Sequence, residues 1–226
     1  MIIGVGGQAQ NGKDTIADYL KETFNARGGK WNRISFAKKV KSIFCDAFGV
    51  DLAFIEKWKV VNEPPPGFLK PIRQSLQFIG DGFREIQGSV WIDNAYKSVT
   101  EPSICSDIRY VNELKVTKEK YGGMTIMVWR PGHENDDQNG SEAQMRPIVD
   151  FYASSGLEGP IDFESLVLSN WFVDKGLGDP PKGAELVDLF IINDKTISDL
   201  QDKIEEIIVP AARKKLPELF AHESWN

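Results

Sequence analysis

The sequence contains few of the residues that build metal clusters or disulfide-linked folds. Among its 226 residues are two cysteines and two histidines. Cys45 and Cys105 lie far apart, and His133 and His222 fit no zinc-binding spacing. No apolar run approaches the ~20 residues of a membrane span, and no basic stretch with an apolar core precedes the first strand pattern. We therefore expect a cytoplasmic protein in a reduced compartment, with no membrane partner.

An excess of basic charge is also missing. The formal net charge is −6 at pH 7, so a large basic surface for duplex nucleic acid is not expected. Internal repeats and low-complexity segments are absent as well. A chain of this length can bury one sizeable core, and we expect residues 1–226 to form a single domain with a mobile subregion.

What the sequence does contain is a glycine-rich turn within its first fifteen residues. A short apolar run leads through this turn into an amphipathic helical pattern. The spacing Gly7-x-x-x-x-Gly12-Lys13 is typical of a phosphate-binding loop, in which backbone N–H groups face a polyphosphate and a lysine meets its terminal phosphates. We therefore predict an ATP site, the alternative being a glycine-rich turn without a ligand. The predicted ATP-binding residues of this stretch are Gly7, Asn11, Gly12, Lys13, Asp14 and Thr15.

The residue after Lys13 departs from the usual loop pattern. Asp14 stands where Ser or Thr normally supplies a hydroxyl to Mg²⁺, and Thr15 follows one place later. A carboxylate is a good ligand for Mg²⁺, so Asp14 could take over the metal contact while Thr15 bonds an inner phosphate. The alternative is that Asp14 only stabilises the first helical turn through the helix dipole.

Alternating strand and helix patterns follow the loop. Residues Trp31–Phe36 are predicted as a second strand and Ala37–Phe48 as a helix. This alternation predicts an α/β fold of the P-loop NTPase type, with a parallel β-sheet covered by helices on both faces and ligands beyond the carboxyl ends of the strands. Ser35 and Phe36 lie at such an end. Lys38, Lys39 and Lys41 follow in the next helical turn, and this cluster could meet a second phosphate. A solvated basic helix face, with Phe36 in the core, would explain them equally well.

A second informative block follows a proline-rich connector. Arg73 and Gln77 are four residues apart on one predicted helix face. Arg73 and Arg84 suit bidentate contacts to a phosphate, and Gln77 could read a base edge. Surface ion pairs of the arginines with Asp81 or Glu85 are the alternative.

A third parallel strand is predicted from Ile104, and an acid and a base lie at its end. Asp107 and Arg109 are two residues apart and share one face if the chain is extended. Asp107 could hold a Mg²⁺-bound water or accept the proton of an acceptor, and Arg109 could hold the acceptor's phosphate. A buried structural ion pair of the two is the competing interpretation.

A lid is predicted over residues 130–147, after an apolar strand at 124–129. Arg130 and Arg146 bracket a polar run and would swing over the phosphates as the lid closes and excludes water. The same composition also describes an idle surface loop.

The rest of the chain, from residue 150, is predicted to end in a strand followed by a helix. Residues 150–182 contain one short helical pattern, Phe163–Phe172, and have no predicted role. The last strand is predicted at 185–192, and a terminal amphipathic helix at 197–216 is interrupted near Pro210.

Taken together, these blocks resemble the phage deoxynucleoside monophosphate kinases, relatives of other P-loop nucleoside monophosphate kinases. The resemblance spans most of the chain. Its pieces, in chain order, are Gly12-Lys13-Asp14-Thr15; Phe36-Ala37 with Lys41; Arg73, Leu76-Gln77, Gly80, Arg84 and Trp91; Asp107-Ile108-Arg109-Tyr110 and Glu113; Ser141-Glu142; and Asn193-Asp194. It implies ATP-dependent phosphorylation of deoxynucleoside monophosphates to diphosphates, with Mg²⁺ as cofactor. The product would supply DNA synthesis, in the host cytoplasm if the gene belongs to a phage.

The resemblance implies that Lys13, Asp14 and Thr15 serve ATP and Mg²⁺ and that Phe36, Lys41, Arg73, Gln77, Arg84 and Arg109 line the acceptor site. Together with the motifs described above, it leads to the full set of predicted site residues. The predicted catalytic residues are Lys13, Asp107, Arg109, Arg130 and Arg146. Asn193 would join the ATP site, and the predicted metal contacts are Asp14, Thr15 and Asp107. The acceptor region would span residues 36–92, and the predicted substrate-binding residues are Ser35, Phe36, Lys41, Arg73, Gln77, Arg84, Trp91, Arg109 and Glu113.

Two departures from the family pattern leave the preferred base open. Lys38 stands where an acid is expected after Phe36-Ala37. The stretch from Glu142 to Asn193 is longer than the family needs, so residues 150–182 are predicted as an atypical insertion. This insertion could rim the base pocket, reshape the lid or make a contact in a homodimer.

Other functions share the loop pattern. Dephospho-coenzyme A and phosphomevalonate kinases are the enzymatic alternatives. A nucleotide-binding regulatory protein without an acceptor site is the non-enzymatic alternative. Such a protein would have no need for Arg73, Arg84 and Arg109, which are placed to meet a second phosphate.

Overall fold

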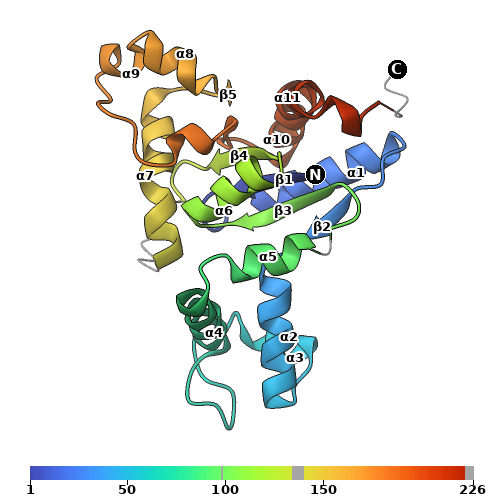
Figure 1. Ribbon diagram of the computed structural model, residues 1–226. Helices are drawn as coiled ribbons and strands as arrows, with labels where there is room; N and C mark the ends of the chain where they lie inside the picture. Colours follow the sequence, from blue (N-terminus) through green and yellow to red (C-terminus); the bar gives the residue numbers. More distant parts are fainter. Residues whose placement is uncertain (98, 134–139, 222–226) are drawn as a thin grey trace. The chain divides into compact units, whose positions relative to one another are not determined.

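The protein packs into two compact units. The computed structural model describes residues 1–97, 99–133 and 140–221 (Figure 1). Unit 1 contains Met1–Arg33 and Thr100–Asn226, and unit 2 contains Ile34–Val99. Unit 2 therefore spans nearly the same residues as the predicted acceptor region. That the two units act as one kinase domain stays a prediction.

The sheet has six strands in the order β2-β3-β1-β4-β6-β5. The strands are β1 (Ile2–Gly6), β2 (Asn32–Ile34), β3 (Ser103–Ile108), β4 (Met124–Trp129), β5 (Gly159–Pro160) and β6 (Leu189–Ile192). β3, β1, β4 and β6 are joined by parallel pairings, whereas the two-residue edge strand β5 runs antiparallel to β6. All residues of β1 are buried, because a central parallel strand is covered on both faces.

Helices cover both faces of this sheet (Figure 1). On one face, α1 (Lys13–Ala26) and the terminal helix pack against every second strand residue. These strand residues include Ile3, Val5, Ile104, Ile126, Val128 and Ile191. On the other face lies α7 (Gly140–Ser155), whose Tyr152 ring is 5.4 Å from the ring of Phe190 in β6. The predicted α/β fold, a mostly parallel sheet between two layers of helices, is confirmed.

The remaining elements of unit 1 are short. Between the strands lie α6 (Val111–Lys115), the π-helical turn η1 (Val116–Lys120), α8 (Phe163–Leu168), α9 (Trp171–Asp174) and the 3-10 turn η2 (Ala184–Leu186). The terminal helix consists of α10 (Ile197–Lys203), the π-helical turn η3 (Ile204–Ile208) and α11 (Val209–Lys215), and the 3-10 turn η4 (Pro217–Leu219) follows after Leu216. Pro210 is the second residue of α11, just after η3, so the interruption predicted near it is a π-helical turn that accommodates the missing N–H of the proline. No helix in residues 1–97, 99–133 or 140–221 is both long and apolar enough to cross a membrane.

Unit 2 is helical and has its own core. Its helices are α2 (Ala37–Phe48), α3 (Leu52–Trp58), α4 (Ile72–Ile86) and α5 (Val90–Lys97). The core of this unit contains Phe44, Ile55 and Ile72, with Phe54, Trp58, Phe68 and Leu76 packed around them. Gly49, with φ of 65°, ends α2, and the Asp51 side chain accepts a hydrogen bond from the Phe54 N–H at 2.7 Å to begin α3.

Candidate functional site

The glycine loop, residues 7–12 between β1 and α1, has the backbone conformation that its glycines predict. Gly7 and Gly12 have φ of 140° and 100°, and Gln10 has φ of 63°. L side chains rarely adopt such values. A Cβ at Gly7 would overlap the carbonyl oxygen of Val128, and a Cβ at Gly12 would lie 2.7 Å from Nδ2 of Asn193. Conformation and space therefore both require glycine at these two positions.

Buried polar groups fix the glycine loop to the ends of neighbouring strands. The Asn11 side chain is fully buried, and its Nδ2 donates to the Val128 carbonyl at 3.4 Å. Asn193, which follows β6, donates from Nδ2 to the Asn11 carbonyl at 3.0 Å. The largely buried Lys13 donates from Nζ to the Gln8 carbonyl. The loop is therefore held in shape by β4 and β6, as a preorganised binding site requires.

The Asp14 carboxylate is held by two residues outside the loop. Ser106 of β3 donates from Oγ to Asp14 Oδ1 at 2.6 Å, and Arg33 of β2 donates from Nη2 to the same oxygen at 3.0 Å. Arg33 Nη2 also donates to Ser106 Oγ at 2.5 Å, and Nη1 pairs with Asp18. Ser106 is buried, whereas the Asp14 side chain is exposed. Arg33, Asp14 and Ser106 thus form a closed cluster at the first turn of α1.

This cluster keeps Asp14 ionised. Partial burial raises its pKa, but hydrogen bonds from Ser106 and Arg33, with the charges of Arg33 and Lys13, bring the pKa below its usual value. An exposed, ionised carboxylate fits Mg²⁺, which takes hard oxygen ligands and needs only one or two carboxylates beside phosphates. Among the described residues, no group of three or more His, Cys, Asp or Glu could hold a metal ion. A cation at Asp14 would therefore take most of its other ligands from phosphate and water.

Ser106 of β3, which contacts Asp14, was not among the predicted site residues, whereas the nearby Asp107 was. Ser106 reaches α1, as does Ile104, which packs in the core on the α1 side of the sheet. The pairing of β3 with β1 shifts its register between Cys105 and Ile108, so strict alternation of side chains does not hold at Ser106 and Asp107. The acid is the more conspicuous residue in the sequence. The roles predicted for Asp107 stay predictions.

The buried Glu113 caps α6. Its Oε2 accepts hydrogen bonds from the backbone N–H groups of Arg109 at 2.7 Å and Tyr110 at 3.2 Å. Glu113 is only 1% exposed. Because both donors belong to the start of its own helix, the carboxylate has a clear structural role, and the substrate contact predicted for it stays a prediction.

Replacing Glu113 by alanine is therefore expected to lower the free energy of unfolding by about 1–2 kcal/mol, because two partly buried N–H groups lose their acceptor. The acceptor KM should stay within about twofold of wild type. Urea unfolding and steady-state kinetics measure the two effects, with the exposed Glu119→Ala as the control. A tenfold rise in acceptor KM at unchanged stability would instead identify Glu113 as a substrate contact.

Two of the predicted acceptor residues are packed inside unit 2. Phe36 is 4% exposed, and its ring lies 5.6 Å from the ring of Tyr96. Trp91 is 3% exposed and donates from Nε1 to the Gly80 carbonyl at 2.8 Å. The alternative interpretation of Phe36 as a core residue therefore agrees with its surroundings, and Trp91 has a structural contact of its own.

Two of the predicted basic residues of unit 2, Lys41 and Arg84, have carboxylate partners. Lys41 donates to Glu56 Oε1 at 2.7 Å, and hydrogen bonds from Lys41 and Lys59 lower the pKa of Glu56 to about 2. Arg84 pairs with Asp81 at 3.2 Å, as the alternative interpretation expected.

One face of α4 carries three of the predicted acceptor residues. Residues 73, 77 and 84 are separated by four and seven positions, so their side chains leave the helix on the same side. Arg73 is exposed and Gln77 half-buried. These residues therefore form one polar surface, which is the arrangement that joint contact with a ligand needs.

The lid stays a prediction. Arg130 follows β4, Arg146 lies in α7, and both are half-buried. The central part of the predicted lid, residues 134–139, lies outside the described residues. Ser35 is half-buried before α2, and Thr15 is half-buried in the first turn of α1.

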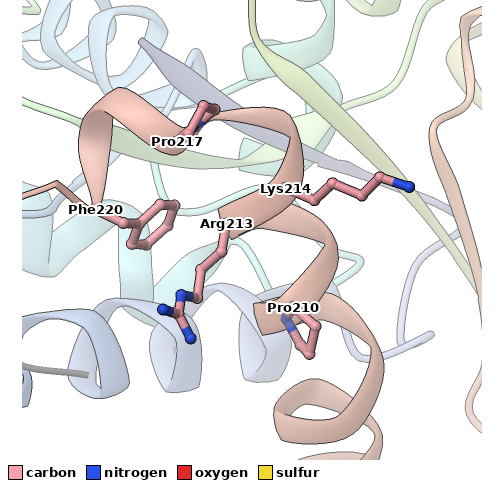
Figure 2. A pocket seen from close by; sticks show the side chains of 5 residues that line it. All are labelled: Pro210, Arg213, Lys214, Pro217 and Phe220. Carbon is pink, nitrogen blue, oxygen red and sulfur yellow. The ribbon is translucent and has the colours of Figure 1, made fainter. Parts of the chain in front are cut away.

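A hollow of about 410 Å³ lies on the terminal helix, away from the glycine loop. Its lining consists of Pro210, Arg213, Lys214, Pro217 and Phe220 (Figure 2). Phe220 packs on Phe24, which lies near the end of α1 opposite to the glycine loop. The side chains of Arg213 and Lys214 point away from each other (Figure 2). They therefore do not converge on one anion.

Comparisons with known proteins find matches among solved structures. No protein-family model and no curated protein matches the chain. Among solved structures, it is similar to shikimate kinase from Aquifex aeolicus vf5 at 13% identity, covering 96% of this chain and 99% of that chain with a TM-score of 0.38. It is also similar to shikimate kinase from Acinetobacter baumannii in complex with shikimate (14% identity, 92% and 93% coverage, TM-score 0.41) and to a gluconokinase from Sinorhizobium meliloti 1021 (13%, 98% and 97%, 0.34). Similarity of this size identifies no acceptor, and the P-loop fold is established by the strand order and by the glycine loop that follows the central strand β1.

Proposed function

We propose that the protein is an ATP-dependent kinase that transfers the γ-phosphate of ATP to a deoxynucleoside monophosphate. The observation that carries the proposal is the glycine loop with Lys13 and the ionised Asp14 at the start of α1. Backbone N–H groups at a helix start, together with a lysine, bind polyphosphates. The acceptor is supported by the sequence resemblance and by the polar face of α4.

The transfer breaks the bond from the γ-phosphorus to the β–γ bridging oxygen and forms a bond from the γ-phosphorus to an acceptor oxygen. Lys13 would follow the charge that develops on the leaving oxygens. Asp14 and Thr15 would hold Mg²⁺, which when bound neutralises phosphate charge. A phosphate monoester has a second pKa of about 6, so the acceptor oxygen is already ionised near pH 7 and needs no general base. A hydroxyl acceptor, as in dephospho-coenzyme A, would need one.

The proposal is tested by ADP release, coupled to an absorbance signal, over a panel of deoxynucleoside monophosphates, dephospho-coenzyme A and phosphomevalonate. We expect release with one or more of the deoxynucleoside monophosphates. A clamp of arginines should leave the free deoxynucleosides very poor substrates, because they lack the phosphate. Release with deoxynucleosides as fast as with their monophosphates would exclude this kinase class.

Binding of the acceptor phosphate and selection of the base are expected to depend on different residues. Replacing Arg109 by lysine keeps the charge but loses the planar fork, so the acceptor KM or turnover should worsen to a similar degree with every base. Replacing Gln77 by alanine should instead change the ranking of the bases. Kinetic constants for each deoxynucleoside monophosphate measure both effects. The division of roles is wrong if the Arg109 variant weakens one nucleotide selectively or the Gln77 variant weakens all alike.

A further inference from the structure

We infer that the two side chains that serve the metal in a phosphate loop have exchanged places in this protein. In P-loop NTPases, the Ser or Thr of the loop supplies a hydroxyl and an acid on a strand supplies a carboxylate. Here the carboxylate of Asp14 is on the loop side and the hydroxyl of Ser106 is on the strand, β3. The inference rests on the proposed function, because it concerns the Mg²⁺ that accompanies ATP.

The contact between the two side chains supports the exchange. β3 pairs directly with β1, the strand from which the glycine loop begins. Ser106 Oγ donates to Asp14 Oδ1 at 2.6 Å, which is the length of a strong bond from a hydroxyl to a carboxylate. The pair therefore still offers one hydroxyl and one carboxylate, with the two elements reversed.

Asp14 lies in the first turn of α1, as the helix-dipole alternative also expects. The N-cap position of α1, Gly12, has no side-chain hydrogen bond. Within the described part of the chain, the hydrogen bonds to the Asp14 carboxylate come from the side chains of Ser106 and Arg33, and both end on Oδ1. Oδ2 of this exposed side chain is therefore available to a cation.

Arg33 is the positioning residue of this pair. Its Nη2 lies 3.0 Å from Asp14 Oδ1 and 2.5 Å from Ser106 Oγ. One guanidinium therefore contacts both positions and would balance a carboxylate at either of them. This geometry suggests a test in which the carboxylate is moved from position 14 to position 106 on β3. If the cluster is only structural, this exchange will not restore the effect of Mg²⁺.

The test is a reciprocal exchange of the two side chains, with the Mg²⁺ dependence of ATP binding as the readout. Titration calorimetry gives the Kd of ATP with Mg²⁺ and with EDTA, and thermal unfolding shows whether each variant is folded. We expect Mg²⁺ to tighten ATP binding at least about tenfold in wild type and by less than about threefold in D14S. The double variant with D14S and S106D should recover at least about tenfold tightening. S103A, a buried serine on the other face of β3, should behave as wild type.

The outcomes separate this inference from the proposed function. A wild-type protein that binds no ATP under either condition would contradict the proposed function itself. A wild-type protein that shows the Mg²⁺ effect, together with a folded double variant that does not recover it, would overturn only the exchange. If the double variant does not fold, D14N decides the question. Its Mg²⁺ titration should lose the tightening, and a titration that overlays wild type would overturn the inference.

Discussion

Replacing Lys13 by alanine is expected to lower turnover at saturating substrates by about 100-fold or more, which corresponds to roughly 2.7 kcal/mol of barrier. Lys13 begins α1, and its Nζ is held against the Gln8 carbonyl at the glycine loop. With ATP bound as proposed, a cation in this place would stabilise the charge that develops between the β- and γ-phosphates. The stability of the fold should change far less than the turnover. Thermal unfolding of the same samples measures this stability.

The control for this variant is Lys21→Ala, because Lys21 lies on the same helix α1 but away from the loop. Its turnover should equal that of wild type. A decrease of less than about tenfold for Lys13→Ala, or roughly 1.4 kcal/mol, would show that the glycine loop does not act on a transferring phosphate.

Replacing Gly7 by alanine is expected to destabilise the fold by about 2–4 kcal/mol and to abolish ATP binding. Two costs add at this position. The φ of 140° strains any L side chain, and the new Cβ would overlap the carbonyl oxygen of Val128 in β4. Relief of the overlap must move the loop or β4, so the N–H groups of the loop lose their arrangement. Urea unfolding and ATP titration measure the two effects.

Gly28→Ala separates the two costs. Gly28 has φ of 97°, and a Cβ there would meet no described atom within 4 Å. This variant should therefore show only the backbone strain, about 1 kcal/mol, with unchanged ATP binding. Equal effects at Gly7 and Gly28 would contradict the close packing of the loop on β4.

Much of the fold could be predicted from the sequence because its signals are local. The apolar run at 124–129 and the amphipathic pattern at 37–48 agree with the bounds of β4 and α2. The last strand begins at Leu189 rather than at the predicted 185, because Ala184–Leu186 form a 3-10 turn and Asp188 turns inward to bind Thr125 and Lys215. The edge strand β5, with two residues, has no periodicity to detect.

From the sequence, the site could be predicted only where its residues lie close together in the chain. The glycine spacing and Lys13 lie within seven residues, and their loop has the expected conformation. The cluster of Arg33, Asp14 and Ser106 joins three elements that are far apart in the sequence. Nothing in the spacing of those residues brings them together, because the pairing of β3 beside β1 does so.

The ion pair between Arg84 and Asp81 is compatible with a role in acceptor binding. The Asp81 side chain is 62% exposed, and the pair is separated by three residues on α4. Such exposed ion pairs contribute at most about 1 kcal/mol to the stability of a protein. A phosphate that accepts two hydrogen bonds from the guanidinium would therefore displace the carboxylate at little cost.

The central claim is phosphoryl transfer to a monophosphate, and following the γ-phosphate of labelled ATP tests it most directly. The protein is incubated with γ-labelled ATP, Mg²⁺ and each deoxynucleoside monophosphate, and the products are separated by charge. We predict that the label appears in a deoxynucleoside diphosphate and that Lys13→Ala removes this product. Label that appears only in inorganic phosphate, at a rate independent of the monophosphate present, would contradict the account.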